Sequence, residues 1–332
     1  MKLIIPMAGR GTRVRPHSHV TPKPLLNVVG QNMVERIVDT FARVLPRPIT
    51  EASFVLGPDF GQRVRDELTA ICEARSITPH FPIQHEALGT AHAVGAAGDQ
   101  LTGEGIAVFA DTLFDMDAGL NLDDSDVIMW VKHVEDPRRF GVAVREGDRV
   151  VQLVEKPTEI ISNEALIGIY YVKDLGLLRE EIQRLIDDDI RGHGAEFQLT
   201  DAFDALIRRG LKVTTASVTE WLDCGTIPAL METTQVYLRK EGEGRREGEV
   251  VNSVVHEPVF VGPGARIENA VVGPNVSVEA GAVIQDARVQ NSILFAHAHV
   301  EGSVLTDSLV GQHATVQGVS GSLNVGDHSS VR

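Results

Sequence analysis

The chain has 332 residues, 43% of them apolar, and a formal net charge of −15 at pH 7. This length suffices for two domains with sizeable cores, and the acidic balance argues against a protein that follows a nucleic-acid backbone by charge. No apolar stretch reaches the ~18 residues of a membrane span. The short apolar start, followed by arginines, does not fit a signal peptide, and two widely spaced cysteines suit a reducing compartment. We therefore expect a cytoplasmic protein with small-molecule ligands.

From the N-terminus to about residue 240, short apolar runs alternate with segments of helical periodicity. Strands are predicted at residues 2–7, 52–57 and 105–111, and helices at 33–45, 60–74 and 89–98. Residues 126–172 carry further strand signals, and helices are predicted again at 174–190 and 201–209. This alternation favours an α/β fold with a mainly parallel, Rossmann-like sheet that is covered on both faces.

A charged, glycine-rich segment then interrupts the pattern. The sequence RKEGEGRREGE, which ends at residue 249, contains no aliphatic residue. Such a segment is typical of a linker. We therefore predict a first domain at 1–240, a linker at 241–249 and a second domain at 250–332.

The predicted second domain repeats aliphatic residues at intervals of five or six. The clearest run is Val261, Ile267, Val272, Val278 and Ile284. A six-residue repeat is typical of a left-handed parallel β-helix, in which about three hexads make one triangular coil. The length of this segment predicts about four coils at that period, with a slip of phase after the run.

The first predicted strand runs into the sequence PMAGRGTRVRP, where glycines and arginines crowd together. Backbone N–H groups in a glycine turn after a strand can bind phosphate oxygens. A Walker loop is excluded because Gly11 is followed by Thr12 and Arg13. A dinucleotide fingerprint is excluded because Val14 stands where that motif needs glycine. Together with Lys23 in TPKPLL, the segment predicts a cradle for a nucleoside triphosphate.

This opening stretch resembles the signature of the sugar-1-phosphate nucleotidylyltransferases, also called nucleotide-sugar pyrophosphorylases. Further segments resemble family motifs in the family's order: QHEALGTAHAV (84–94), FADTLF (109–114), VEKP (154–157), IGIYYV (167–172), GAEFQLTDAF (194–203) and WLDCGT (221–226). The hexapeptide tail is also common there. The resemblance covers essentially the whole chain and is strongest to glucose-1-phosphate thymidylyltransferases and uridylyltransferases. Arg10, Val14 and Ala110 depart from the family pattern, but none of them removes a charged catalytic group.

The resemblance implies that an oxygen of a sugar 1-phosphate attacks the α-phosphorus of a nucleoside triphosphate, and that pyrophosphate leaves. Such a reaction depends on charge neutralisation and in-line alignment. Mg²⁺ held by carboxylates suits both needs. The resemblance assigns the metal to Asp111 and Asp223. It assigns catalytic roles to Arg13, Lys23, Asp111 and Lys156.

The resemblance also predicts the remaining substrate contacts. The nucleotide-binding residues would be Ala8, Gly9, Gly11, Thr12, Arg13, Gln84, Gly89 and Thr90. Gln84 offers a donor and an acceptor that suit the O4/N3 edge of uracil or thymine, and Gly89 leaves room for a base against the backbone. The sugar-phosphate-binding residues would be Gly141, Glu155, Lys156, Gly168 and Glu196. Glu155 would accept hydrogen bonds from sugar hydroxyls and Lys156 would bind the phosphate. Both can serve one ligand only where the strand ends, because adjacent strand residues point to opposite faces.

Several alternatives stay open at this point. Both dTTP and UTP fit the pattern, with glucose 1-phosphate as the favoured acceptor. The chain could also be a bifunctional N-acetylglucosamine-1-phosphate uridylyltransferase and acetyltransferase, with His297 or His299 as base. A third reading is a non-catalytic regulatory subunit that binds nucleotide sugar. The open end of a β-helix predicts a homo-oligomer, and the loop histidines His17 and His19 are expected to be solvated.

Overall fold

The computed structural model describes residues 1–9, 11–242 and 244–332, so Arg10 and one residue of the predicted linker, Glu243, lie outside the described residues. The chain forms two compact units that do not follow its linear order. The first contains Met1–Gly9 and Ile37–Trp221, and the second contains Arg10–Arg36 and Leu222–Arg332. The predicted domain limits stay predictions. None of the described helices combines the length and the apolar character needed to cross a membrane.

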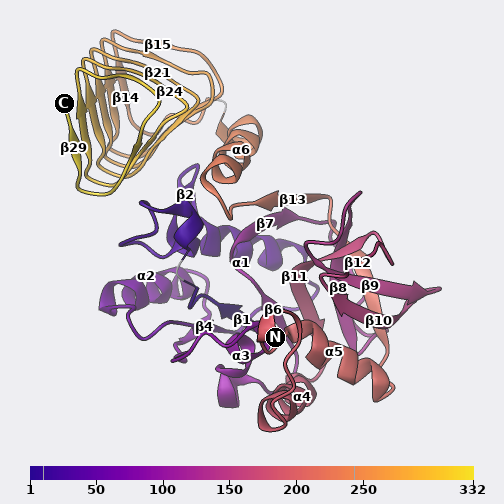
Figure 1. Ribbon diagram of the computed structural model, residues 1–332. Coiled ribbons are helices and arrows are strands. Elements are labelled where there is room, and N and C mark those ends of the chain that lie inside the picture. Colours follow the sequence, from indigo (N-terminus) through magenta and orange to yellow (C-terminus); the bar gives the residue numbers. More distant parts are fainter. Residues whose placement is uncertain (10, 243) are drawn as a thin grey trace. The chain divides into compact units, whose positions relative to one another are not determined.

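The first unit is built on a mixed sheet (Figure 1). In the described residues its strands lie in the order β5 (Thr78–His80), β4 (Glu51–Val55), β1 (Lys2–Pro6), β6 (Gly105–Val108), β11 (Glu164–Val172), β8 (Val127–His133), β12 (Val213–Ser217), β10 (Arg149–Glu155) and β9 (Gly141–Glu146). Strands β5, β4, β1 and β6 are mutually parallel, whereas β11 runs antiparallel to both β6 and β8. Two short strands, β7 (Thr112–Asp115) and β13 (Glu220–Asp223), lie outside this sheet. The predicted Rossmann-like α/β class is confirmed.

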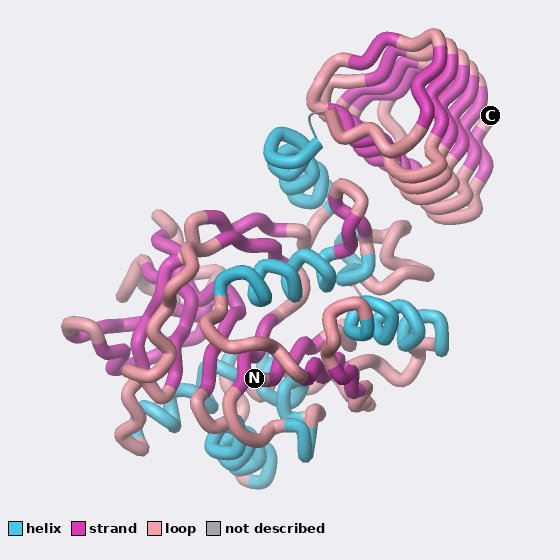
Figure 2. Tube along the Cα trace, turned by 180° about the vertical axis from the view of Figure 1, so that it is seen from behind, coloured by secondary structure: helices cyan, strands magenta, loops and turns pink. Residues whose placement is uncertain are grey.

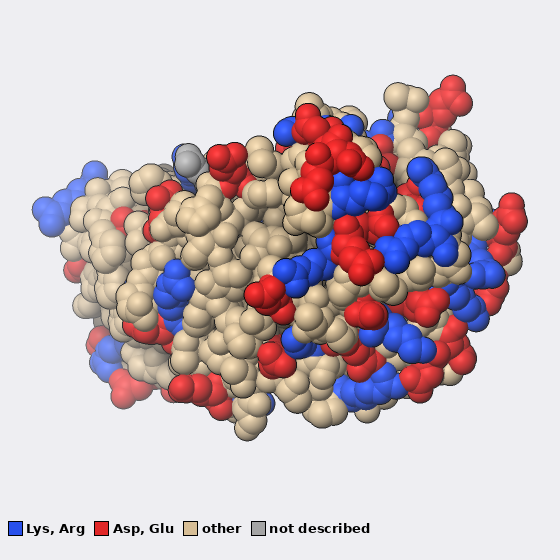
Figure 3. All heavy atoms as spheres, turned by 90° about the horizontal axis from the view of Figure 1, so that it is seen from below, with Lys and Arg blue, Asp and Glu red and all other residues tan. Residues whose placement is uncertain are grey.

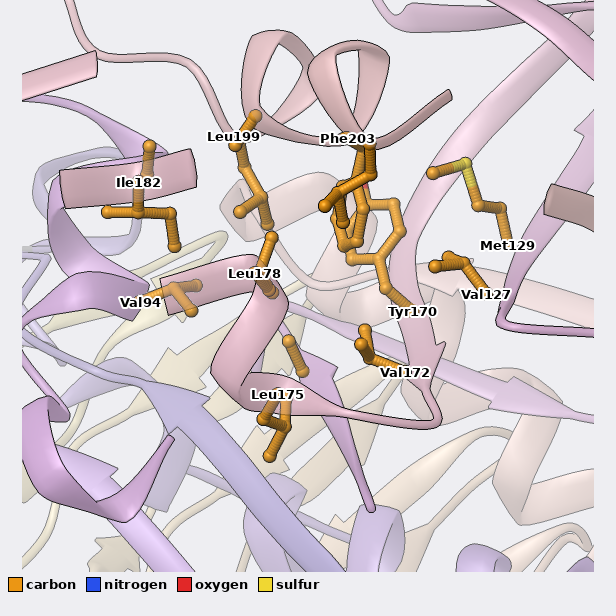
Figure 4. Packing of buried hydrophobic residues seen from close by; sticks show 14 of the residues in the cluster. Val94, Val127, Met129, Tyr170, Val172, Leu175, Leu178, Ile182, Leu199 and Phe203 are labelled. Carbon is orange, nitrogen blue, oxygen red and sulfur yellow. The ribbon is translucent and has the colours of Figure 1, made fainter. Parts of the chain in front are cut away.

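Helices pack against this sheet and form the main core. They are α1 (Met33–Val44), α2 (Gln62–Glu73), α3 (Thr90–Gly95), α4 (Leu175–Asp187) and α5 (Leu199–Arg208). Apolar side chains of α3, α4 and α5 meet those of β8 and β11 in one cluster (Figure 4). Within it, the ring centroids of Tyr170 and Phe203 lie 4.8 Å apart. This packing fixes α5, whose first turn carries residues of the candidate site.

The second unit begins with residues 11–36, here named the N-terminal loop. It contains two helical turns, η1 (Thr12–Val14) and η2 (Lys23–Leu25), and a hairpin of β2 (Asn27–Val28) and β3 (Gln31–Asn32). Farther along the chain, α6 (Ile227–Tyr237) begins where the Thr226 hydroxyl accepts a hydrogen bond from the Ala229 N–H at 3.3 Å. A π-helical turn, η5 (Leu238–Gly242), follows α6.

The rest of the second unit is a parallel β-helix, whose stacked strands are clear in Figure 2. Its first sheet contains β14 (Glu249–Val251), β17 (Arg266–Glu268), β20 (Val283–Gln285), β23 (His299–Glu301), β26 (Thr315–Gln317) and β29 (Ser330–Val331). The second contains β15 (Val254–Val255), β18 (Val271–Val272), β21 (Arg288–Gln290), β24 (Val304–Thr306) and β27 (Ser320–Gly321). The third contains β16 (Val259–Val261), β19 (Val276–Val278), β22 (Ser292–Leu294), β25 (Leu309–Val310) and β28 (Asn324–Val325). Every aliphatic residue of the predicted run is fully buried. These three parallel sheets are consistent with the left-handed β-helix that the hexads predict.

The coils shorten along the chain. Paired residues are 17 positions apart at Arg266 and Val283, 16 apart at Val283 and His299, and 15 apart at Thr315 and Ser330. The expectation of about four coils is wrong, because a coil takes fewer than the ~18 residues of three full hexads. Among the described residues the three sheets hold six, five and five strands. The predicted slip of phase falls where the spacing first changes.

Charged side chains of both signs are interspersed on the face of the molecule shown in Figure 3. Many charged side chains form ion pairs across the surface, as Arg209 does with Glu180 at 3.2 Å. Exposed pairs of this kind contribute little to stability, because water screens them. The buried apolar clusters therefore hold each unit together.

The inward-facing aliphatics should set the stability of the β-helix. Ile284 is fully buried in β20, whereas Val304 on β24 is 50% exposed. We expect Ile284→Ala to cost about 2–4 kcal/mol, because it leaves a cavity in a packed core, and Val304→Ala to cost much less. Denaturant unfolding of the two variants measures the difference. Equal losses in both variants would contradict the inward-facing stack.

Candidate active site

Several predicted site residues follow strands that end at one edge of the first unit's sheet. Strand β1 ends at Pro6, and Ala8 and Gly9 come directly after it. The neighbouring parallel strand β6 ends at Val108, and Asp111 follows. The carboxyl ends of parallel strands meet at one edge, where open α/β sheets bind ligands. The fold therefore brings Ala8, Gly9 and Asp111 to the same edge.

Gln84 is buried beside helix α3, with only 7% of its surface exposed. Its side-chain Nε2 lies 3.0 Å from Nδ1 of His92. Since an amide nitrogen can only donate, His92 accepts this bond through an unprotonated Nδ1. The amide of Gln84 thus has a fixed orientation. His92 is an addition to the predicted site, because an isolated histidine in a helix carries no sequence signal of its own.

Gly89 has a positive φ of 121° and lies against the backbone of Phe197. A Cβ at Gly89 would stand 2.5 Å from the Phe197 carbonyl oxygen. Two backbone hydrogen bonds join these segments: the Phe197 N–H donates to Leu88 O at 2.9 Å, and the Ala91 N–H donates to Phe197 O at 2.8 Å. The chain itself therefore requires glycine here. A role of Gly89 beneath a base stays a prediction.

Thr90 connects the predicted base-binding segment to the start of helix α5. Its hydroxyl donates to Oε1 of Gln198 at 3.2 Å and accepts from the N–H of Leu199 at 2.9 Å. Gln198 in turn donates to Oε2 of Glu196 at 3.3 Å. Glu196 therefore lies beside the segment of Gly89 and Thr90. Its predicted contact with the sugar stays a prediction.

Glu155 and Lys156 lie where strand β10 ends, as their joint use of one ligand requires. Glu155 is the last residue of the strand, and Lys156 has a positive φ of 45° that turns the chain. Nζ of Lys156 lies 3.8 Å from Oε1 of Glu155. The Thr200 hydroxyl, in the first turn of α5, donates to Oε2 of Glu155 at 2.7 Å. A Cβ at Gly141 would stand 2.7 Å from the same oxygen, so a larger residue there would displace the Glu155 carboxylate.

Asp201 lies close enough to Glu155 for the two charges to interact. Burial raises the pKa of Asp201, and the nearby charges of Glu155 and Asp204 raise it further. Gly168 has a φ of 81°, and a Cβ there would stand 3.2 Å from Cδ2 of Phe109, whose N–H donates to Gly168 O at 3.0 Å. Thr200 and Asp201 are additions to the predicted site. They fall inside the motif GAEFQLTDAF, but nothing in the sequence shows that they face Glu155.

In the second unit, Gly11 lies beside Lys23. Gly11 has a φ of 56°, and a Cβ there would stand 3.0 Å from Cβ of Lys23. The Ser18 hydroxyl donates to Gly11 O at 2.6 Å. Lys23 is 8% exposed. The predicted triphosphate residues Gly11 and Lys23 are therefore neighbours within the N-terminal loop.

Arg13 and Asp223 also come together in the second unit. The 3₁₀ turn that includes Thr12 carries Arg13. Oδ1 of Asp223 accepts a hydrogen bond from the Gly225 N–H at 2.7 Å. A Cβ at Gly225 would stand 2.8 Å from that oxygen and 3.3 Å from Nη2 of Arg13. A guanidinium and a carboxylate more than 200 positions apart in sequence therefore flank the same glycine.

The predicted metal ligands belong to different units. Asp111 lies in the first unit and Asp223 in the second. Their joint binding of one Mg²⁺ stays a prediction. Within the described residues, no three or more His, Cys, Asp or Glu side chains gather as a metal site. Carboxylate oxygens are nevertheless the donors that Mg²⁺ prefers, and this ion often takes only one or two carboxylates together with substrate phosphates.

Comparison with known proteins identifies the family. The sequence model of the family described as Nucleotidyl transferase matches residues 2–240. The chain belongs to this family. The resemblance predicted from its motifs is confirmed.

Individual relatives agree with this assignment. The chain is 29% identical over 283 residues to a glucose-1-phosphate thymidylyltransferase of Streptomyces antibioticus, covering 81% of this chain and 75% of the relative. It is 27% identical over 215 residues to the bifunctional protein GlmU of Methanococcus maripaludis, covering 63% of this chain but only 48% of the relative. A UDP-glucose pyrophosphorylase from Acinetobacter baumanii shares the fold, with a TM-score of 0.56 at 19% identity over 72% of this chain and 94% of that chain.

His17, in the N-terminal loop of this nucleotidyltransferase, is buried, so the expectation that it is solvated is wrong. Its Nε2 lies 2.6 Å from Oδ1 of Asn324, and its ring centroid lies 5.2 Å from that of Phe295. Asn324 is 307 positions away, and sequence patterns carry no signal for such a contact. Burial lowers the pKa of His17, against smaller opposing effects of Asn324 and Asp327.

The lowered pKa of His17 predicts a loss of stability in mild acid. In the unfolded chain His17 takes up a proton near its usual pKa of 6.5, whereas the folded chain resists it. Stability should therefore fall as pH drops from 6.5 through the lowered pKa, by at most about 1.4 kcal/mol per pH unit for this one proton. Urea unfolding between pH 5 and pH 8 measures this slope.

His17→Gln should flatten the slope, because glutamine does not titrate in this range. His19→Gln is the matched control, since His19 is exposed in the same loop. An identical slope in wild type and His17→Gln would contradict the buried neutral histidine.

Proposed function

We propose that the protein transfers a nucleotidyl group from dTTP or UTP to a sugar 1-phosphate, most favourably glucose 1-phosphate, with Mg²⁺ as cofactor. The observation that carries this proposal is the Glu155–Lys156 pair at the end of β10, where a carboxylate and an ammonium lie 3.8 Å apart, close enough to serve one ligand. A sugar 1-phosphate presents hydroxyls and a phosphate, which match these two groups. Membership of the nucleotidyltransferase family supplies the reaction class.

The proposed reaction forms one P–O bond and breaks another. A phosphate oxygen of the sugar 1-phosphate attacks the α-phosphorus of the triphosphate. The bond from the α-phosphorus to the bridging oxygen breaks, and that oxygen leaves with pyrophosphate. Arg13 and Lys23 offset the negative charge of the triphosphate, and Lys156 that of the attacking phosphate. Bound Mg²⁺, held by Asp111 and Asp223, would supply further charge neutralisation.

The remaining residues select the substrates. Gln84, held by His92, presents a fixed amide to the base. Glu155, held by Thr200, accepts hydrogen bonds from the sugar hydroxyls. A buried acceptor left without its hydroxyl costs about 1–3 kcal/mol, so the site discriminates against sugars that lack the matching group. The name of the relative from Streptomyces antibioticus, a glucose-1-phosphate thymidylyltransferase, supports glucose 1-phosphate as the acceptor.

A bifunctional enzyme is the second candidate. The relative named bifunctional protein GlmU favours it, as does the position of His299 in the β-helix, where Nε2 lies 3.7 Å from Oε2 of Glu301. His297 is less suited as a base, because its ring stacks on His313 with centroids 4.8 Å apart. Acetyl transfer to an amino-sugar phosphate, observed in an assay of the purified chain, would support this candidate. A regulatory subunit without activity is the third candidate, and turnover in the assay described below would exclude it. We further propose a cytoplasmic homo-oligomer that assembles through the β-helix.

Pyrophosphate release tests the proposal directly. The purified chain is assayed with four nucleoside triphosphates and with glucose-, N-acetylglucosamine- and mannose-1-phosphate. We expect turnover with dTTP or UTP and glucose 1-phosphate, and complete loss of turnover in EDTA that Mg²⁺ restores. No turnover with any pair of substrates would refute the proposal.

Two arginines of the N-terminal loop provide a matched control. Arg13→Ala should lower kcat by about 10²–10³, as loss of one charge-stabilising donor typically does. Arg15→Ala removes an exposed arginine two positions away and should leave kcat within about twofold of the wild type. Equal losses in the two variants would contradict the role of Arg13.

A further inference from the structure

The β-helix holds a buried carboxylate that faces the N-terminal loop. Glu279 follows strand β19 and is 1% exposed. Its Oε1 accepts hydrogen bonds from the Ser277 hydroxyl at 2.7 Å and from the Gly30 N–H at 3.2 Å. Its Oε2 accepts one from Nδ2 of Asn27 at 3.2 Å. Two of the three donors therefore come from a hairpin about 250 positions earlier in the chain.

Burying this carboxylate is costly, so its partners matter. Burial raises the pKa of Glu279 overall, against smaller opposing effects of its hydrogen bonds and of the charge of Arg36. An ionisable group with no partner would not be kept inside a packed coil. The hairpin of β2 and β3 supplies two hydrogen-bond donors, from Asn27 and Gly30, that the coil alone does not.

The hairpin tip also fits the coil by shape. Gly30 has a φ of 81°, and a Cβ there would stand 2.7 Å from Cζ of Phe260 on β16. Nη1 of Arg245 donates to Val29 O at 3.4 Å, and its guanidinium lies 4.7 Å from the centroid of the Phe260 ring. The hairpin tip thus packs on the Phe260 ring, beside the buried carboxyl group of Glu279.

A second contact holds the N-terminal loop against the β-helix, on the other side of Lys23 from the hairpin. His17 is buried against Phe295 and Asn324 of the β-helix. Lys23 lies between His17 and the hairpin. Lys23 therefore sits on a segment that the β-helix holds on both sides, and Arg13 lies four positions before the contact at His17.

Arg36 secures the end of the loop. Its guanidinium donates to Val28 O at 2.8 Å and to Val29 O at 3.1 Å. It also pairs with Glu241 at 3.1 Å and lies 3.9 Å from the ring centroid of Tyr237. Arg36 is 5% exposed. The loop is therefore fixed at its end as well as along its length.

We propose that the β-helix positions the triphosphate-binding residues Arg13 and Lys23, and that Glu279 is the positioning residue that locks their loop. This inference rests on the proposed function. Glu279 does not touch the substrates; it acts through the hairpin. The C-terminal quarter of the chain would then serve catalysis and not only assembly.

Glu279→Ala tests the proposal by kinetics. We expect KM for the triphosphate to rise about tenfold, because the loop that carries Arg13 and Lys23 loses a buried hydrogen-bond acceptor, with KM for the sugar 1-phosphate nearly unchanged. Glu279→Gln keeps an acceptor oxygen and should restore most of the wild-type KM. Glu268→Ala, which removes an outward carboxylate of the same β-helix, is the control.

Hydrogen exchange separates this inference from the proposed function, because it needs no turnover. Amides of residues 11–32 should exchange faster in Glu279→Ala, while those of the β-helix strands keep their rates. If Glu279→Ala does not fold, Asn27→Ala removes the loop's side-chain donor without opening the coil. It should give the same faster exchange in the loop and the same rise in KM for the triphosphate. A folded variant with unchanged loop exchange and an unchanged KM for the triphosphate would overturn the proposal.

Discussion

A buried carboxyl group links the N-terminal loop to the β-helix. Glu279 lies inside the β-helix, where an unpartnered carboxyl group is unstable, and its partners Asn27 and Gly30 belong to the N-terminal loop. Because this carboxyl group needs those donors, the loop packs with the C-terminal part of the chain rather than with the strand that precedes it. The cations Arg13 and Lys23 take their positions from this packing.

The chemistry of the proposed reaction is divided between the two units. The first unit presents groups that read the base and the sugar, with Gln84 and Glu155 each held by a neighbour on an adjoining helix. The second unit presents the cations that meet the phosphates, together with Asp223. Nucleotidyl transfer needs both sets at once.

Much of the fold follows from local patterns in the sequence. Continuous apolar runs predict buried strands, and hexads predict inward aliphatics, because both patterns reflect a short structural period. The coil count failed because hexads do not reveal that turns lose a residue or two along the stack. The prediction that His17 is solvated failed for a different reason: its partner Asn324 lies 307 positions away. Thr200 was missed although its motif was recognised, because a motif does not show which side chain faces Glu155.

The coupling between Asn27 and Glu279 tests the account most directly. A double-mutant cycle with Asn27→Ala, Glu279→Ala and the double variant, followed by urea unfolding, isolates the free energy of their interaction. The double variant should lose less stability than the sum of the single variants, by about 1 kcal/mol or more. Losses that add within about 0.3–0.5 kcal/mol would mean that the buried carboxylate does not hold the loop.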